Sequence, residues 1–134
     1  MKESEIRIGN YFEYKKHIIE FAIEDFVEIS NNDQFLELFL KPIKLTEQWL
    51  KDFGFEKTTY NAIHSLQGWE STVTYIIDEL WGIIFCKKQI IFGYESDNEG
   101  YVSLCSIQYV HQLQNLYFAL TKKELTSNLK VIKL

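Results

Sequence analysis

A run of 22 residues, 100–121, contains no Asp, Glu, Lys or Arg, although charged residues make up 25% of the whole chain. Segments that face water normally carry charges, because charged side chains lose their hydration on burial and are rarely found inside a protein. We therefore expect this run to meet protein rather than water, and any fold of the chain must accommodate it.

Within this run, the segment YVHQLQNLYFAL has apolar residues at helical spacing, which predicts a helix over about 108–120. The expected core face consists of Tyr109, Val110, Leu113, Leu116, Tyr117 and Leu120. The opposite side is also uncharged and includes His111, Gln114, Asn115 and Phe118. In one interpretation this second face is internal, and its amides pair with buried backbone groups. In the other, these four residues form a binding face for another protein or for a second copy of the chain.

A second helix is predicted over about 46–53, where the start and stop signals agree. Thr46 is a good N-cap, and Leu45 and Leu50 occupy the two positions of a hydrophobic staple. Gly54 is placed as the left-handed residue after the helix, and Phe55 as its apolar follower.

The other apolar segments favour strands, in two groups that each precede a helix. Alternation from Ile19 to Ile23, continued at Val27 and Ile29, indicates strands with one wet face. Further strands are expected near 6–8, 35–40, 73–77, 83–86, 90–94 and 101–107. The segment 73–80 also fits a helix that ends before Gly82, but the β-forming residues of 72–75 favour a strand. The predicted fold class is α+β, with a mainly antiparallel curled sheet or small barrel and two helices.

The length of 134 residues suits a single domain, 1–134, and a core that needs no disulfide or metal. Aromatics reach 16% and the net charge is −5, which argues against a broad basic surface for nucleic acid. The first residues are polar and no apolar run approaches the ~20 residues that cross a bilayer. We expect a cytoplasmic protein that does not bind membranes, with Cys86 and Cys105 reduced and mostly buried.

No catalytic or metal-binding motif is present, so we expect no cofactor and no catalytic residue. His17, His64 and His111 are far apart and lack metal-ligand spacing. Carboxylates gather at 24–28, 78–79 and 95–99, where solvated turns are the usual explanation. Two alternatives stay open: a nucleotide-like ligand held among aromatic rings and Gln or Asn groups, and a hydrolase with a scattered Cys/His or carboxylate pair.

Three segments, RIGNYF (7–12), PIKLTEQWLKDFGF (42–55) and YVHQLQNLYFAL (109–120), resemble blocks shared by a group of small uncharacterised proteins from Bacteroidetes bacteria and their phages or mobile elements. The resemblance implies an accessory protein of phage or mobile-element type and transfers no functional residue. Together with the uncharged helix face, it leads us to expect a non-enzymatic protein that binds another protein or itself.

Overall fold

The computed structural model describes residues 1–31, 34, 40–58, 73–86, 89–96 and 100–127. The chain divides into two compact units, which we describe separately. Unit 1 comprises Met1–Leu45 and Tyr109–Leu134, and unit 2 comprises Thr46–Gln108. The prediction of a single domain is not tested by this division.

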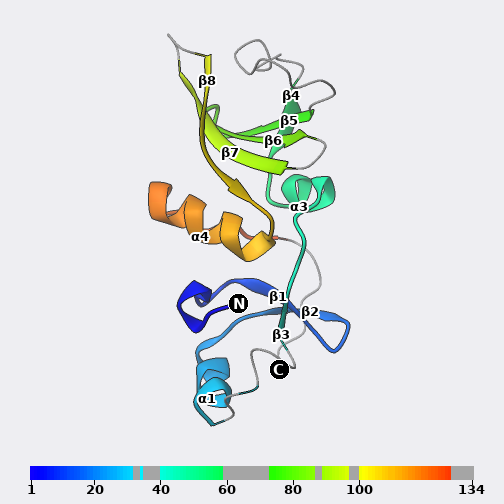
Figure 1. Cartoon of the computed structure of the whole chain (residues 1–134), viewed down its shortest axis with the longest axis vertical. Helices are drawn as coiled ribbons and strands as arrows, with labels where there is room; N and C mark the ends of the chain where they lie inside the picture. Colours follow the sequence, from blue (N-terminus) through cyan, green and yellow to red (C-terminus); the bar gives the residue numbers. More distant parts are fainter. Residues whose placement is uncertain (32–33, 35–39, 59–72, 87–88, 97–99, 128–134) are drawn as a thin grey trace. The chain divides into compact units, whose positions relative to one another are not determined.

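Unit 1 contains a three-stranded antiparallel sheet in the order β2-β1-β3 (Figure 1). Its strands are β1 (Tyr11–Tyr14), β2 (His17–Glu20) and β3 (Leu40–Pro42), and its helices are a short 3-10 turn (Glu3–Glu5), α1 (Ile23–Asn31) and α4 (Val110–Thr121). The core of the unit consists of Ile6, Phe12, Ile19, Phe21, Ile29 and Leu40. Helix α4 packs against β1, so the two ends of the chain build this unit together.

The strand pattern expected beyond Glu20 is wrong, because residues 23–31 form the helix α1. The carboxylate of Asp25, two positions into the helix, accepts a hydrogen bond from the backbone N–H of Ala22 at 2.8 Å and so closes its first turn. Phe26 and Ile29, three residues apart, then face the core. Apolar residues at 23, 26, 27 and 29 fit a helical period, but the preceding alternation over 19–23 concealed it.

Unit 2 begins with α3 (Glu47–Asp52), which has the predicted caps. The side chain of Thr46 accepts a hydrogen bond from the Trp49 N–H at 3.4 Å. Gly54 has φ +96°, and the N–H of Phe55 bonds back to the Leu50 carbonyl at 2.9 Å. This pair of features is the Schellman ending expected from the sequence.

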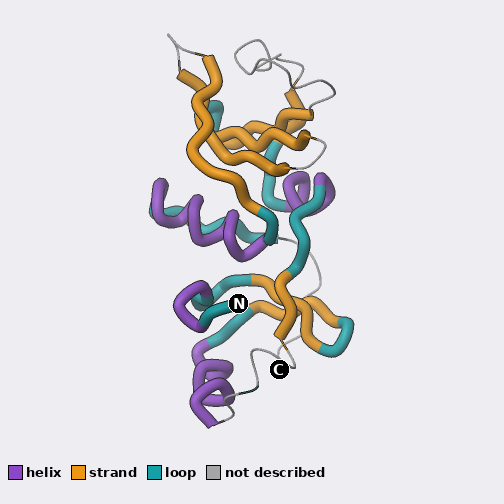
Figure 2. The backbone as a smooth tube through the Cα atoms, in the orientation of Figure 1, coloured by secondary structure: helices purple, strands orange, loops and turns teal. Residues whose placement is uncertain are grey.

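The described part of unit 2 also contains a five-stranded antiparallel sheet in the order β4-β5-β6-β7-β8, and Figure 2 shows its strands in orange. The strands are β4 (Glu56–Thr58), β5 (Val73–Ile77), β6 (Trp81–Cys86), β7 (Gln89–Ser96) and β8 (Gly100–Ile107). The strands predicted near 73–77, 83–86, 90–94 and 101–107 are confirmed, and β4 was not predicted.

The ring of Tyr101 lies over two glycines of this sheet. Gly82 and Gly93 are directly opposite each other on β6 and β7. The Tyr101 hydroxyl donates to the carbonyls of Gly82 at 3.0 Å and Ile91 at 3.2 Å. A Cβ built on Gly82 would stand 2.8 Å from the ring, so only glycine leaves room for it.

The predicted α+β class is confirmed: two antiparallel sheets combine with helices, and the helices expected near 46–53 and 108–120 are α3 and α4. Among the described residues neither sheet closes, so the small barrel is wrong. The strand near 6–8 is also wrong, because residues 7–10 form a turn. The strand predicted over 35–40 lies outside the described residues except for Leu40.

Candidate interaction surfaces

The side-chain amide of Gln114 joins α4 to two other segments of unit 1. It is fully buried. Its oxygen accepts a hydrogen bond from the Tyr11 N–H at 2.9 Å, and its nitrogen donates to the carbonyls of Gly9 at 2.9 Å and Leu125 at 3.3 Å. An amide can do this because it offers both an acceptor and two donors without carrying a charge. The side chain at this position is therefore uncharged because it is buried inside the unit.

Asn115 connects the same helix to the N-terminal segment. Its oxygen accepts from the Arg7 Nε at 3.2 Å, and its nitrogen donates to the Glu5 carbonyl at 2.7 Å. Arg7 also forms an ion pair with Glu124, and its guanidinium carbon lies 4.2 Å from the centre of the Phe118 ring. Phe118 is half-buried, and the Arg7 cation of its own chain lies against its ring in the geometry of a cation–π contact.

His111 is the one buried imidazole of the described chain. Its ring centre lies 5.0 Å from that of Phe12 and 5.9 Å from that of Tyr109. Among the described residues, neither ring nitrogen has a hydrogen-bond partner. Burial lowers the pKa of His111 below its ordinary value of 6.5, so the ring is neutral at pH 7.

Of the four residues predicted as a partner-binding face, two are buried in unit 1 and two are half-buried. His111 and Gln114 are enclosed by the chain's own segment 9–12, as the internal interpretation predicted. Asn115 and Phe118 retain part of their surface. Partner binding by this face stays a prediction. Another exposed part of the charge-free run 100–121 lies in unit 2, on β8.

Four strand edges have no neighbouring strand among the described residues: those of β2, β3, β4 and β8. Natural edges are commonly blocked by charges or proline. Strand β2 ends on Glu20, β3 contains Lys41 and Pro42, and β4 contains Glu56 and Lys57. Strand β8 has eight residues with neither charge nor proline, so it is both the longest and the least protected of the four edges.

The middle of β8 is open to water. Residues 103–106 are all exposed, so the expectation that the whole charge-free run is covered is wrong there. The pairing with β7 passes from Phe92–Cys105 to Gly93–Ser103, which leaves Leu104 as an extra residue in a β-bulge.

The burial expected for Cys105 is wrong, because the residue lies on this edge, and Cys86 is half-buried. Sequence reasoning missed β8 as a surface because it took the absence of charge to mean that the whole run 100–121 is covered.

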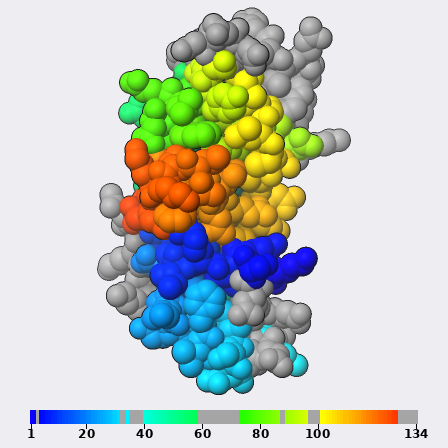
Figure 3. Space-filling view, turned by 90° about the vertical axis from the view of Figure 1, so that its left-hand side faces the viewer, coloured from blue at the N-terminus to red at the C-terminus, as the bar shows by residue number. Residues whose placement is uncertain are grey.

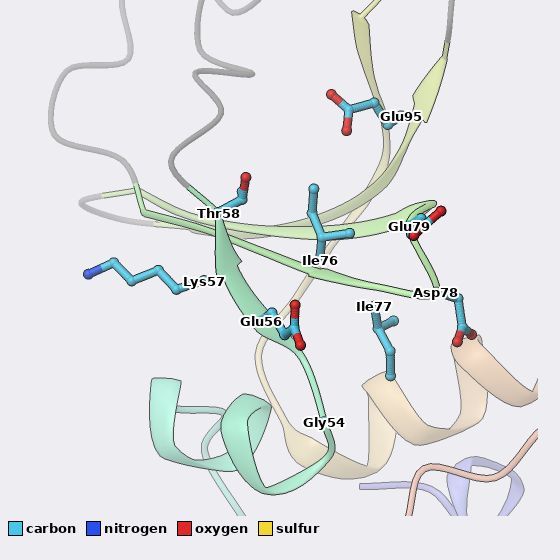
Figure 4. Close-up of a pocket in the computed structure, with 9 residues that line it drawn as sticks. All are labelled: Gly54, Glu56, Lys57, Thr58, Ile76, Ile77, Asp78, Glu79 and Glu95. Carbon is cyan, nitrogen blue, oxygen red and sulfur yellow. The ribbon is translucent and has the colours of Figure 1, made fainter.

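An open hollow of about 700 Å³ lies elsewhere in unit 2, between the ends of β4, β5 and β7. Its carboxylates come from Glu56, Asp78, Glu79 and Glu95, and Figure 4 shows them spread around the opening rather than turned to one point. Its described lining contains no aromatic ring and no Gln or Asn side chain, which the nucleotide-like alternative requires. The nucleotide-like alternative stays a prediction, and this hollow does not offer the groups it needs.

The histidines considered for catalysis occupy different environments in the described part of the chain. His17 is exposed on β2, His111 is buried in unit 1, and His64 lies outside the described residues. No group of three His, Cys, Asp or Glu side chains that could hold a metal occurs among the described residues.

Comparison of the chain with family models, curated proteins and solved structures gives no match. The resemblance to the Bacteroidetes and phage group therefore stays a prediction. Within the described residues, no helix combines the length and apolar character needed to cross a membrane.

Proposed function

We propose that the protein is a non-enzymatic, self-associating accessory protein of the cytoplasm, of the phage or mobile-element type that the three sequence blocks suggest. Two copies join by antiparallel pairing of their β8 edges. The observation that carries the proposal is the contrast between β8 and the other three free edges, since β8 alone lacks charge and proline.

A second copy suits this edge better than a charged partner does. The chain carries a net charge of −5, so two copies repel each other over most of their surface. The β8 edge is an exception, because neither strand carries a charge and their pairing brings no like charges together. A two-fold axis perpendicular to the sheet also makes the two strands antiparallel, which is the pairing of every neighbour in this sheet.

The bulge at Leu104 limits how tightly the copies hold. It divides β8 into two stretches of about four residues, and regular pairing uses the stretch on one side of it. Such a contact is smaller than the roughly 1,000 Å² of a stable interface. We therefore expect a reversible dimer whose population rises with protein concentration.

The test is the mass of the full chain by sedimentation equilibrium over a wide concentration range. The wild type is expected to move from monomer to dimer as the concentration rises. The double variant Ser103→Lys/Ser106→Lys places a cation on each side of the bulge and is expected to stay monomeric. Both positions are exposed, so the circular dichroism spectrum and melting temperature are expected to stay close to those of the wild type.

A charge-matched control lies on the opposite edge of the same sheet. Glu56→Lys on β4 changes the net charge from −5 to −3, as the double variant does, and Glu56 is exposed. It is expected to dimerise at least as well as the wild type. A wild type that stays monomeric throughout, or equal loss of the dimer in both variants, would refute the proposal.

A further inference from the structure

The most exposed large apolar side chains of the described chain gather in one place on unit 1. Ile8, Ile23 and Val27 are 51%, 65% and 57% exposed, more than any other large apolar residue described. Ile8 and Ile23 line the same hollow, and Val27 follows Ile23 by one helical turn. Figure 3 shows the dark blue N-terminal segment bordering the lighter blue segment that contains α1. We call these three residues the apolar patch.

Hydrogen bonds fix Ile8 in its exposed position. It occupies a tight turn in which the Asn10 N–H bonds to the Arg7 carbonyl at 3.1 Å. Gly9 has φ +95°, which the third position of a type II turn requires. The Gly9 N–H donates to the Phe21 carbonyl at 2.8 Å, and the Phe21 N–H donates to the Asn10 carbonyl at 2.7 Å. Ile8 is therefore held beside the start of α1 by backbone bonds, and the patch needs little ordering on binding.

The start of α1 is equally well held. Asp25 is buried, and its carboxylate accepts the Ala22 N–H while its own N–H donates to the Ala22 carbonyl at 3.0 Å. Phe26, on the inner side, packs edge-on against Phe21, with ring centres 4.8 Å apart. These inward contacts fix which side chains of the helix face outward, and Ile23 and Val27 are among them.

Carboxylates surround the apolar patch. Glu24 and Glu28 are exposed next to Ile23 and Val27, and Glu20 lines the hollow with Ile8. Helix α1 contains no Lys or Arg, and the nearest cation in the turn, Arg7, is paired with Glu124. The surface is therefore apolar at its centre and negative at its rim.

We infer that this patch binds a basic amphipathic segment of another protein, with apolar side chains on the patch and Lys or Arg against its rim. A second copy of the chain fits poorly here, because it would bring the three carboxylates opposite their own copies. An anionic membrane surface is disfavoured for the same reason. This inference concerns unit 1 only and does not depend on the proposed pairing of β8.

A synthetic helical peptide of Leu and Lys, labelled with a fluorophore, is the probe, and fluorescence anisotropy with the full chain is the measurement. Ile23→Ser/Val27→Ser is expected to weaken binding at least about tenfold, since fully burying one such side chain is worth more than a tenfold change in affinity. Leu120→Ser, which removes an exposed apolar side chain of α4 in the same unit, is expected to leave the affinity unchanged.

The charged rim is tested separately by Glu24→Gln/Glu28→Gln. We expect about threefold or greater weakening, which disappears at high salt because exposed charges are screened. The charge-matched control is Glu56→Gln/Glu79→Gln at the hollow of Figure 4, which is expected to have no effect. No binding of the peptide to the wild type would overturn the inference. It would also be overturned by equal binding of a Leu and Glu peptide, or by loss of binding only in the control at the Figure 4 hollow.

Discussion

Acidification is expected to destabilise unit 1 through His111. Its imidazole is buried between two aromatic rings and no described group pairs with its nitrogens. Burial lowers its pKa in the folded protein; the N-terminal ammonium acts in the same direction, and the Glu5 carboxylate opposes them. The unfolded chain therefore takes up a proton first. The stabilising effect of the neutral ring is complete above about pH 6.5 and is lost as the pH falls towards the folded-state pKa.

The size of the loss follows from proton linkage. Stability falls by at most about 1.4 kcal/mol per pH unit for one such group. His111→Leu removes this pH-dependent part of the stability and also removes two unpaired buried nitrogens. The altered packing against the two rings does not depend on pH, so it cancels when one variant is compared at two pH values.

Urea unfolding at pH 7.5 and 5.0 measures the loss of stability. Hydrogen exchange of the α4 amides at the same two pH values shows whether the loss is in unit 1. The wild type is expected to lose more stability between the two pH values than His111→Leu. Equal losses in the two proteins, or a His111 pKa of 6.5 or higher by NMR titration, would contradict the reasoning.

Four further variants, one of them a control, test the packing and the backbone. Gln114→Leu removes the hydrogen bonds of this side chain to three backbone groups and is expected to lower the free energy of unfolding by at least about 2 kcal/mol. Gln48→Leu, on the exposed side of α3, is expected to change it by less than about 0.5 kcal/mol in urea titrations. Gly93→Ala places a Cβ 2.1 Å from a backbone carbonyl and is expected to cost unit 2 about 2 kcal/mol or more by the same measurement. Lys15→Asn/Lys16→Gly relieves two left-handed residues, with φ 47° and 67°, and is expected to raise the melting temperature.

The sequence predicted α3 and α4 because their signals are local. Thr46 and Gly54 define the ends of α3 through hydrogen bonds within ten residues of chain. The apolar spacing of α4 likewise fits only a helix. Strands β6 to β8 were predictable for a similar reason, since each is an apolar run bounded by turn residues. Strand β5 was less so, because its apolar residues also fit a helical spacing.

Other features depended on contacts that a linear pattern does not contain. The face of α4 that is buried includes His111 and Gln114, because β1 packs there, whereas Leu120, expected in the core, is 44% exposed. The exposed edge of β8 follows from its place at the end of the sheet, which is a property of strand order and not of composition. Tyr101 could not be matched to Gly82 and Gly93 without the register of three strands.

The two stretches of unit 1 are separated by all of unit 2, and this has a consequence for synthesis on the ribosome. The Val110 N–H bonds to the Ile43 carbonyl at 2.8 Å, and Lys44 forms a β-bridge with Tyr109, so the chain leaves and re-enters unit 1 at nearly one point. Residues 46–108 emerge completely before α4 does, and the first 45 residues must wait for their last helix. The inserted unit is therefore expected to mature first, and a truncated translation product would release a half-built β1–β3 sheet with Phe12 uncovered.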